Sequence, residues 1–139
     1  MNLKASSSFR SGDTAGALAR ILLHAKDAVT DGANAVLDIS RQYVPVDKGD
    51  LASSGGVEAD VKGITVVAVV SYTSGHAAYN EFGTGKRGEE SGHGTDYGTT
   101  GIEYSPTWPG MSGHPYLRPA LDACRPDIIA AFADQGFTI

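Results

Sequence analysis

The feature that most constrains this chain is a long stretch of helical periodicity near its start. Between Asp13 and Tyr43, apolar and small residues recur at steps of three and four positions, and most charged residues fall off that stripe. This spacing predicts one helix of about 30 residues, which ends before Pro45 because proline disfavours the helical conformation in the residue preceding it. In a chain of 139 residues such a helix needs a long partner surface, and a β-sheet is the natural one.

A β-hairpin is predicted to follow the long helix. Apolar and acidic residues alternate over residues 57–61, which indicates a strand with one wet face, and Lys62-Gly63 suits a two-residue turn. Residues 64–72 are β-branched on both faces, so we expect the central strand of the sheet here, covered on both sides. Residues 77–82 are expected to form a third, shorter strand.

The end of the chain returns to helical periodicity over residues 115–135. Pro119 fits the first position of a helix, and Pro126 is expected to kink the helix or divide it in two. One apolar stripe is formed by Leu117, Leu121, Cys124, Ile128, Ile129 and Phe132. The lone Cys124 is expected to fill the core. These patterns predict an α+β fold, with a long N-terminal helix packed on a small, mainly antiparallel sheet of three or four strands, and a C-terminal helix.

Two segments do not fit this regular pattern. Residues 1–12 are rich in serine and glycine, so we expect a flexible N-terminal arm before an α+β domain that spans residues 13–139. Residues 83–113 hold nine of the 18 glycines and are expected to form a long loop. Its aromatic residues are Tyr97, Tyr104 and Trp108. Either residues 102–104 form a short strand and Trp108 docks on the domain, or these rings contact another chain.

Composition and spacing exclude several kinds of chemistry. The net charge of −5 argues against a protein that binds nucleic acid by collecting phosphates. The four histidines lack the spacing of a metal site, and Gly83-Thr84-Gly85-Lys86 lacks the spacing of a phosphate-binding loop. No Gly-x-Ser-x-Gly motif occurs, and no apolar run approaches the roughly 20 residues that cross a bilayer. We therefore predict no catalytic residue, no cofactor, no metal and no membrane partner.

Two alternatives remain open at this point. One is a small metal-dependent hydrolase or nuclease that uses Glu81, Glu89, Glu90 and the histidines. The other is a free-standing binding module, such as an inhibitor, which stays monomeric until it meets its target.

Three segments in order along the chain resemble motifs of one family. They are residues 45–51, residues 78–84 and residues 115–121, and they resemble signatures of the tail-component proteins of tailed bacteriophages, also called neck, tail-completion or head-to-tail joining proteins. The matching positions are Pro45, Gly49, Leu51, Tyr79, Glu81, Phe82, Gly83, Pro115, Leu117, Arg118 and Pro119. The chain departs from the family pattern at Lys48, where threonine is usual, and at Ala52, where arginine often follows the leucine.

The resemblance implies a structural protein of the virion without catalysis. Its members resemble ring-formers, often sixfold, at the head–tail junction, where they join the head connector to the tail. The implied partners are copies of the chain itself, the neighbouring connector or head-closure proteins, and the tail terminator or tail tube. Assembly would take place in the host cytoplasm, and DNA would pass through the ring without specific binding. The acidic balance suits such a channel, because attraction to phosphates is what makes DNA stick.

The motif residues also have expected structural roles. Pro45 and Gly49 are expected to shape the turn after the long helix, and residues 115–119 to anchor the end of the long loop. Tyr79 and Phe82 are expected to be core aromatics on opposite faces of the third strand. An ion pair between Glu81 and Arg118 is expected to join that strand to the last helix.

Overall fold

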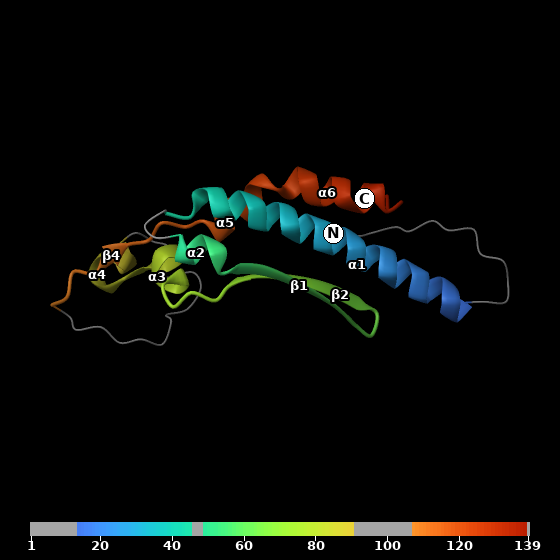
Figure 1. Ribbon diagram of the computed structural model, residues 1–139, viewed down its shortest axis with the longest axis horizontal. Helices are drawn as coiled ribbons and strands as arrows, with labels where there is room; N and C mark the ends of the chain where they lie inside the picture. The colour runs from blue at the N-terminus through green and yellow to red at the C-terminus, as the bar shows by residue number, and fades with distance from the viewer. Residues whose placement is uncertain (1–13, 46–48, 91–106, 139) are drawn as a thin grey trace.

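The computed structural model describes residues 14–45, 49–90 and 107–138, and in it the long helix is the middle of three layers. Helix α1 (Thr14–Tyr43) lies between a hairpin on one side and the C-terminal helices on the other (Figure 1). The hairpin is formed by β1 (Gly55–Lys62) and β2 (Thr65–Tyr72), and the helices are α5 (Leu117–Ala123) and α6 (Arg125–Asp134). The predicted α+β fold and the predicted long helix are both confirmed.

The hairpin occurs where the alternating pattern predicts it, with its turn one residue later. Lys62 pairs with Thr65, so Gly63 and Ile64 form the turn instead of Lys62 and Gly63. Gly63 has a φ of +65°, and glycine at the first turn position is typical of the turns that match the twist of a hairpin.

The prediction that residues 64–72 are covered on both sides is wrong for the isolated chain. The strands β1 and β2 form a sheet of their own, without a third strand among the described residues. Burial alternates along β2, and the side chains of Val67 and Val69 on its outer face are exposed. The second apolar face therefore has no covering layer within the described part of the chain.

The predicted third strand is a helix. Helix α3 (Ala77–Phe82) begins after Ser74, whose carbonyl accepts a hydrogen bond from the Ala77 N–H at 3.0 Å. Alanine and glutamate favour helix over strand, and this preference prevails over the aromatic residues. Gly83, with a φ of +78°, ends the helix, as glycine commonly does. Tyr79 and Phe82 are thus half-buried residues of a helix and not of a strand.

The predicted long loop has structured ends. Strand β3 (Gly83–Thr84) pairs with β4 (Met111–Ser112), and α4 (Gly85–Glu90) follows β3. The backbones approach so closely that a Cβ at Gly110 would overlap the Thr84 carbonyl oxygen. Glycine is therefore required there. Residues 1–13 and 91–106 lie outside the described residues, and with them the predicted arm, Tyr97, Tyr104 and the possible strand at 102–104.

The C-terminal segment is divided into two helices, as the proline predicts. Helix α5 ends at Ala123, and Pro126 is the second residue of α6, where its missing N–H breaks no hydrogen bond within the helix. Pro119 occupies the third position of α5 and not the first. The predicted apolar stripe is only partly buried, because Leu121 and Ile129 remain exposed.

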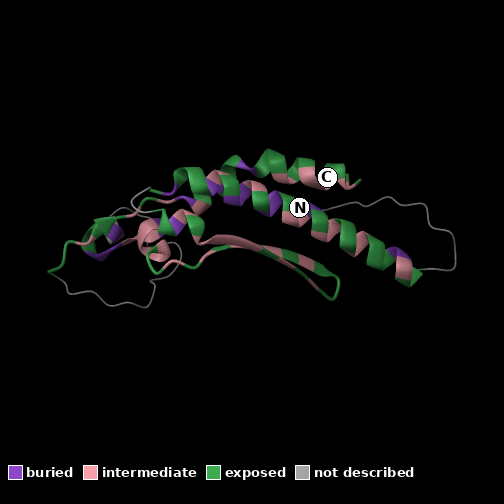
Figure 2. Ribbon diagram, viewed as in Figure 1, coloured by how far each residue is buried: buried purple, intermediate pink, exposed green. Residues whose placement is uncertain are grey.

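The core is small and divides into two clusters. One is formed by Val36, Ala120 and Cys124, and the other by Val44, Leu51 and Tyr116. Figure 2 shows that burial is concentrated along the middle of α1 and at its end, whereas the tip of the hairpin is exposed. Several large apolar residues lie outside the core: Ile64 is 81% exposed and Val69 is 52% exposed. The chain thus keeps apolar surface that a neighbouring molecule could cover.

We expect Gly55→Ala to destabilise the protein and Gly56→Ala to leave it almost unchanged. A methyl group at Gly55 would lie 2.8 Å from Tyr72 Cε1, and a hydrogen bond of 2.6 Å to Ser40 Oγ holds that ring in place. A methyl group at Gly56 would meet nothing within 4 Å. Gly55→Ala should lower the free energy of unfolding in urea by about 1–3 kcal/mol, and Gly56→Ala should change it by less than about 0.5 kcal/mol. Equal losses would mean that contact with Tyr72 does not determine the cost.

We expect the thiol of Cys124 to resist modification in the folded protein. Its side chain is 1% exposed, and burial together with the nearby Asp127 charge raises the pKa of Cys124, which keeps the thiol neutral. An aromatic disulfide reagent at neutral pH should react at least about tenfold more slowly with the folded than with the urea-unfolded chain. Equal rates would mean that α5 and α6 do not pack stably on α1.

Candidate functional site

The three sequence motifs meet at the end of α1, and we call this region the motif junction. Leu51, from the first motif, packs in one buried cluster with Val44 and with Tyr116 of the third motif. Tyr72 at the end of β2 contacts Tyr116 edge to face, with ring centroids 4.9 Å apart. The fold therefore brings together Leu51 and Tyr116, which lie 65 positions apart in the sequence.

A buried carboxylate links the second motif to the third. The side chain of Glu81 is 7% exposed, and its oxygens accept hydrogen bonds from the backbone N–H groups of Tyr116 at 2.8 Å, Leu117 at 3.1 Å and Arg118 at 3.3 Å. The next residue, Pro119, has no N–H to donate. Glu81 thus accepts from each of the N–H groups that the start of α5 can offer. A negative charge at this end of a helix is also favoured by the helix dipole.

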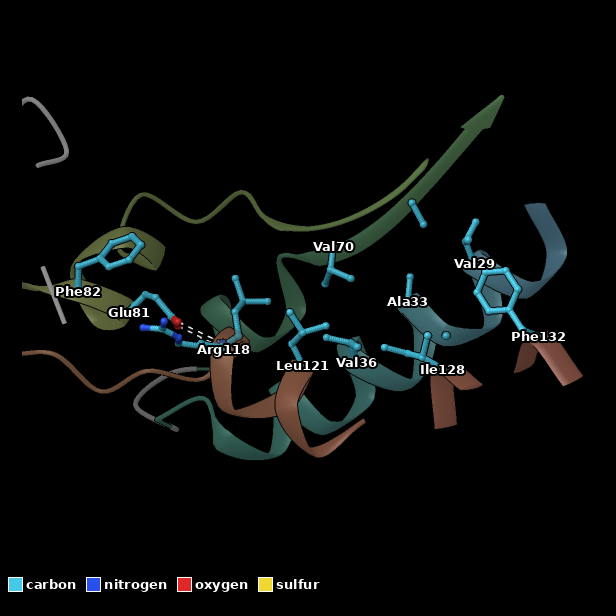
Figure 3. Close-up of a pocket in the computed structure, with 13 residues that line it drawn as sticks. Val29, Ala33, Val36, Val70, Glu81, Phe82, Arg118, Leu121, Ile128 and Phe132 are labelled. Atoms are coloured by element: carbon cyan, nitrogen blue, oxygen red, sulfur yellow. Dashed lines mark hydrogen bonds between the residues drawn. The ribbon is translucent and has the colours of Figure 1, made fainter. Parts of the chain in front are cut away.

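The predicted partner of Glu81 was the side chain of Arg118, and the bonds described above run to backbone N–H groups instead. Figure 3 shows the Arg118 side chain directed toward the Glu81 carboxylate. The ion pair between the two side chains stays a prediction. The link between the second motif and the last helices, which the ion pair was expected to provide, comes from the backbone hydrogen bonds.

The other motif residues surround this link. Pro45 lies two residues beyond the end of α1 and is exposed, and Gly49 has a φ of +77° just before α2 (Asp50–Ser53). Glycine is suited to that left-handed conformation. Gly83 is required by close packing, since a Cβ there would lie 2.6 Å from the Gly113 nitrogen. Pro115 and Leu117 are half-buried beside Tyr116.

Tyr116 is held as a structural hydrogen-bond donor. Its hydroxyl donates to the Ala77 carbonyl oxygen at 3.3 Å. Burial raises the pKa of Tyr116 far above its usual value, and the charge of Glu81 and the nearby Tyr72 add to this effect. The phenol is therefore neutral at physiological pH and does not act as a base. The buried side chains of Glu81 and Tyr116 thus both have structural roles in the motif junction.

A cavity of about 710 Å³ lies beside the motif junction, and Trp108 contributes to its wall. Pro45 and Gly49 of the first motif and Tyr79 of the second also line it. The Trp108 side chain is 46% exposed. Of the three aromatic residues predicted to contact partners, Trp108 is the one within the described residues, and it both lines the domain surface and presents a face to solvent.

An apolar groove of about 520 Å³ runs along α1, and the sequence analysis did not predict it (Figure 3). Gly32, Ala33 and Val36 of α1 form its floor. Ala68 and Val70 of β2 form one wall, and the opposite wall includes Leu121, Ile128 and Phe132. The sequence signal was the small residues in the middle of the α1 stripe, which allow α6 to approach α1 but leave space beside it.

Among the described residues, those considered for a hydrolase do not form a metal site. Glu81 is occupied in holding α5, and no group of three or more histidine, cysteine, aspartate or glutamate residues suited to a metal ion occurs within the described segments. The side chains of Glu89 and Glu90, and the whole of His93, lie outside what the structure describes. None of the helices that the structure describes has the length and hydrophobicity needed to cross a membrane.

Comparison with known families finds a match over about half of the chain. Residues 15–83 match the family model described as "Bacteriophage HK97-gp10, putative tail-component". Over these residues the chain is similar to the HK97-gp10-like family. The match confirms the resemblance to tail-component proteins of tailed bacteriophages. The HK97-gp10-like segment includes α1, the hairpin and the first two motifs up to Gly83, while the third motif lies beyond it. Searches of curated proteins and of solved structures found no significant match.

We expect Glu81→Gln to destabilise the protein, because the neutral amide loses the charge that strengthens the hydrogen bonds to the start of α5. The free energy of unfolding in urea, followed by circular dichroism, should fall by about 1–3 kcal/mol. Glu58→Gln on the exposed face of β1 is the matched control and should change it by less than about 0.5 kcal/mol. An unchanged midpoint for Glu81→Gln would show that α5 does not depend on this carboxylate.

Proposed function

We propose that this chain is a structural subunit of a tailed-phage virion that forms a ring at the head–tail junction and joins the head connector to the tail. The family match over residues 15–83 is the observation that carries the proposal, because it assigns the segment to phage tail components. The finer position in the neck follows from the resemblance of all three motifs to neck and tail-completion proteins.

The surfaces of the chain support a role in assembly. Apolar side chains that a monomer would be expected to bury, such as Ile64 and Val69 of the hairpin region, are exposed. The apolar groove opens beside β2, whereas the outer face of β1 carries Glu58 and Asp60. A subunit with two unlike surfaces can join head to tail with its copies, and such contacts form a ring when the rotation closes.

The buried polar groups support a role without catalysis. The Glu81 carboxylate holds the start of α5, and the Tyr116 hydroxyl donates to a backbone carbonyl, so neither is available to a substrate. The chain would work by its shape, with copies of itself, a connector or head-closure protein and a tail terminator or tube protein as partners. The net charge of −5 would let DNA pass without being held.

Deleting the gene from the phage genome should leave filled heads and tails that are complete but separate. Electron microscopy of the lysate and a plaque titre measure this outcome. Expression of the wild-type chain from a plasmid should restore joined particles, and so should expression of Gly56→Ala, which alters a position with free space around it. Infectious virions from the deletion strain without the plasmid would contradict the proposed function.

A further inference from the structure

We propose that neighbouring copies of this chain join by β-strand pairing, with the free edge of β2 in one copy against the free edge of β1 in the next. The hairpins would then form one continuous sheet around the assembly. This inference rests on the proposed ring, and it assigns the surface by which the ring is built.

The hairpin leaves a defined set of backbone groups unpaired. The Thr73 N–H donates to the Ser54 carbonyl oxygen at 3.2 Å, and these residues continue the ladder in which Gly55 pairs with Tyr72. Hydrogen-bonded and non-hydrogen-bonded pairs alternate along an antiparallel ladder. The backbone groups that point away from the hairpin are therefore those of Val57, Ala59 and Val61 on β1 and of Val66, Ala68 and Val70 on β2.

The free edge of β2 lacks the features that normally prevent an edge strand from pairing with another chain. Natural edge strands carry charges, prolines or bulges that prevent pairing with another chain. Over its eight residues, Thr65–Tyr72, β2 has no charged residue and no proline, and its pairing with β1 is continuous without a bulge. Such an edge is a template for an added strand.

The edge of β1 is partly occupied and so limits where pairing can occur. Arg41 Nη2 donates to the Gly55 carbonyl oxygen at 3.1 Å, and the Val61 N–H donates to Asp60 Oδ1 at 2.8 Å. The groups of Val57 and Ala59 lie between these two contacts. The middle of β1 is thus the part that can pair with a neighbouring β2.

The apolar groove lies where a strand added to β2 would run. The groove is lined by Ala68 and Val70 of β2 and extends to Ile128 and Phe132 of α6 (Figure 3). A third strand would lie about 4.8 Å from β2, with its inward side chains on the same side as Ala68 and Val70.

The β1 strand of a neighbouring copy fits this position. Val57, Ala59 and Val61 form its apolar inward face, and they are half-buried in the isolated chain. Seated beside β2, these side chains would cover the groove. One contact would thus satisfy the free backbone groups of both strands and bury apolar surface in the same place.

Length, direction and charge favour β1 as the occupant. Both strands have eight residues. The two strands of the hairpin are antiparallel, so rotation about an axis along the strands places each β2 antiparallel to the next β1, and this head-to-tail contact can repeat. Pairing of two β1 strands would bring together two sets of Glu58 and Asp60, whereas the facing residues of β2 are uncharged. Pairing of two β2 strands would close a dimer and leave both β1 edges free.

The first test replaces a residue whose N–H points away from the hairpin. Ala68→Pro removes the edge N–H without removing a hydrogen bond between β1 and β2, and proline is tolerated at such edge positions. Ala68→Ser keeps the N–H and is the matched control. In the deletion strain, Ala68→Pro should lower the yield of joined particles by about tenfold or more relative to Ala68→Ser. A purified Ala68→Pro chain that is folded by circular dichroism and still joins particles at the level of Ala68→Ser would overturn the strand pairing and leave the proposed function intact.

The second test uses disulfides and does not depend on proline being tolerated. Adjacent strands place Cβ atoms close enough for a disulfide, and strands two apart do not. After mild oxidation, Ala68→Cys subunits mixed with Val57→Cys or with Ala59→Cys subunits should give linked dimers, whereas Ala68→Cys subunits alone should not. Dimers from Ala68→Cys alone would show that two β2 strands pair with each other. Either that result or the absence of dimers from both mixtures would overturn the inference.

Discussion

The hydrogen bonds between the Glu81 carboxylate and the start of α5 are the contact on which the motif junction depends. They satisfy backbone N–H groups at the start of α5 that have no acceptor within the helix. Helix α5 then places Ala120 and Cys124 against Val36 of α1. One charged side chain thus holds the start of a helix whose other end packs on α1.

The rest of the fold is built along α1 and has little depth. Helix α1 is covered by the hairpin on one side and by the C-terminal helices on the other. Small residues in the middle of α1 let α6 come close, since a Cβ at Gly32 would lie 3.2 Å from Ile128 Cγ1. The small side chains where α6 approaches α1 do not fill the space next to this contact, and that space is the apolar groove. A fold of this shape buries less per residue than a compact one, so contacts with neighbouring molecules would add a large share of its stability in an assembly.

Sequence reasoning succeeds where periodicity is long and fails where several short signals compete. The stripe from Asp13 to Tyr43 and the alternation over residues 57–61 each repeat often enough to identify one structure, and both are found. Residues 77–82 are too few for such a repeat, and the helix preference of Ala77, Ala78 and Glu81 prevailed over the aromatic residues. The ion pair of Glu81 with Arg118 stays a prediction, but sequence reasoning missed that Glu81 accepts hydrogen bonds from backbone N–H groups. Reasoning from side chains alone does not consider backbone N–H groups as partners. The position of Pro119, which has no N–H, does indicate that the donors at the start of this helix come from the residues before it.

The error at residues 64–72 has a different origin, because the pattern does not distinguish a strand that its own chain covers from one that a neighbouring molecule would cover. A strand with β-branched residues on both faces is typical of a strand covered on both sides, and Val67 and Val69 are bare in the isolated chain. If the chain works in an assembly, some of its apolar residues would be buried only by contact with neighbouring subunits. The exposed β-branched row, the unprotected edge of β2 and the groove next to it then have one explanation, which is that the hairpin is completed by other molecules.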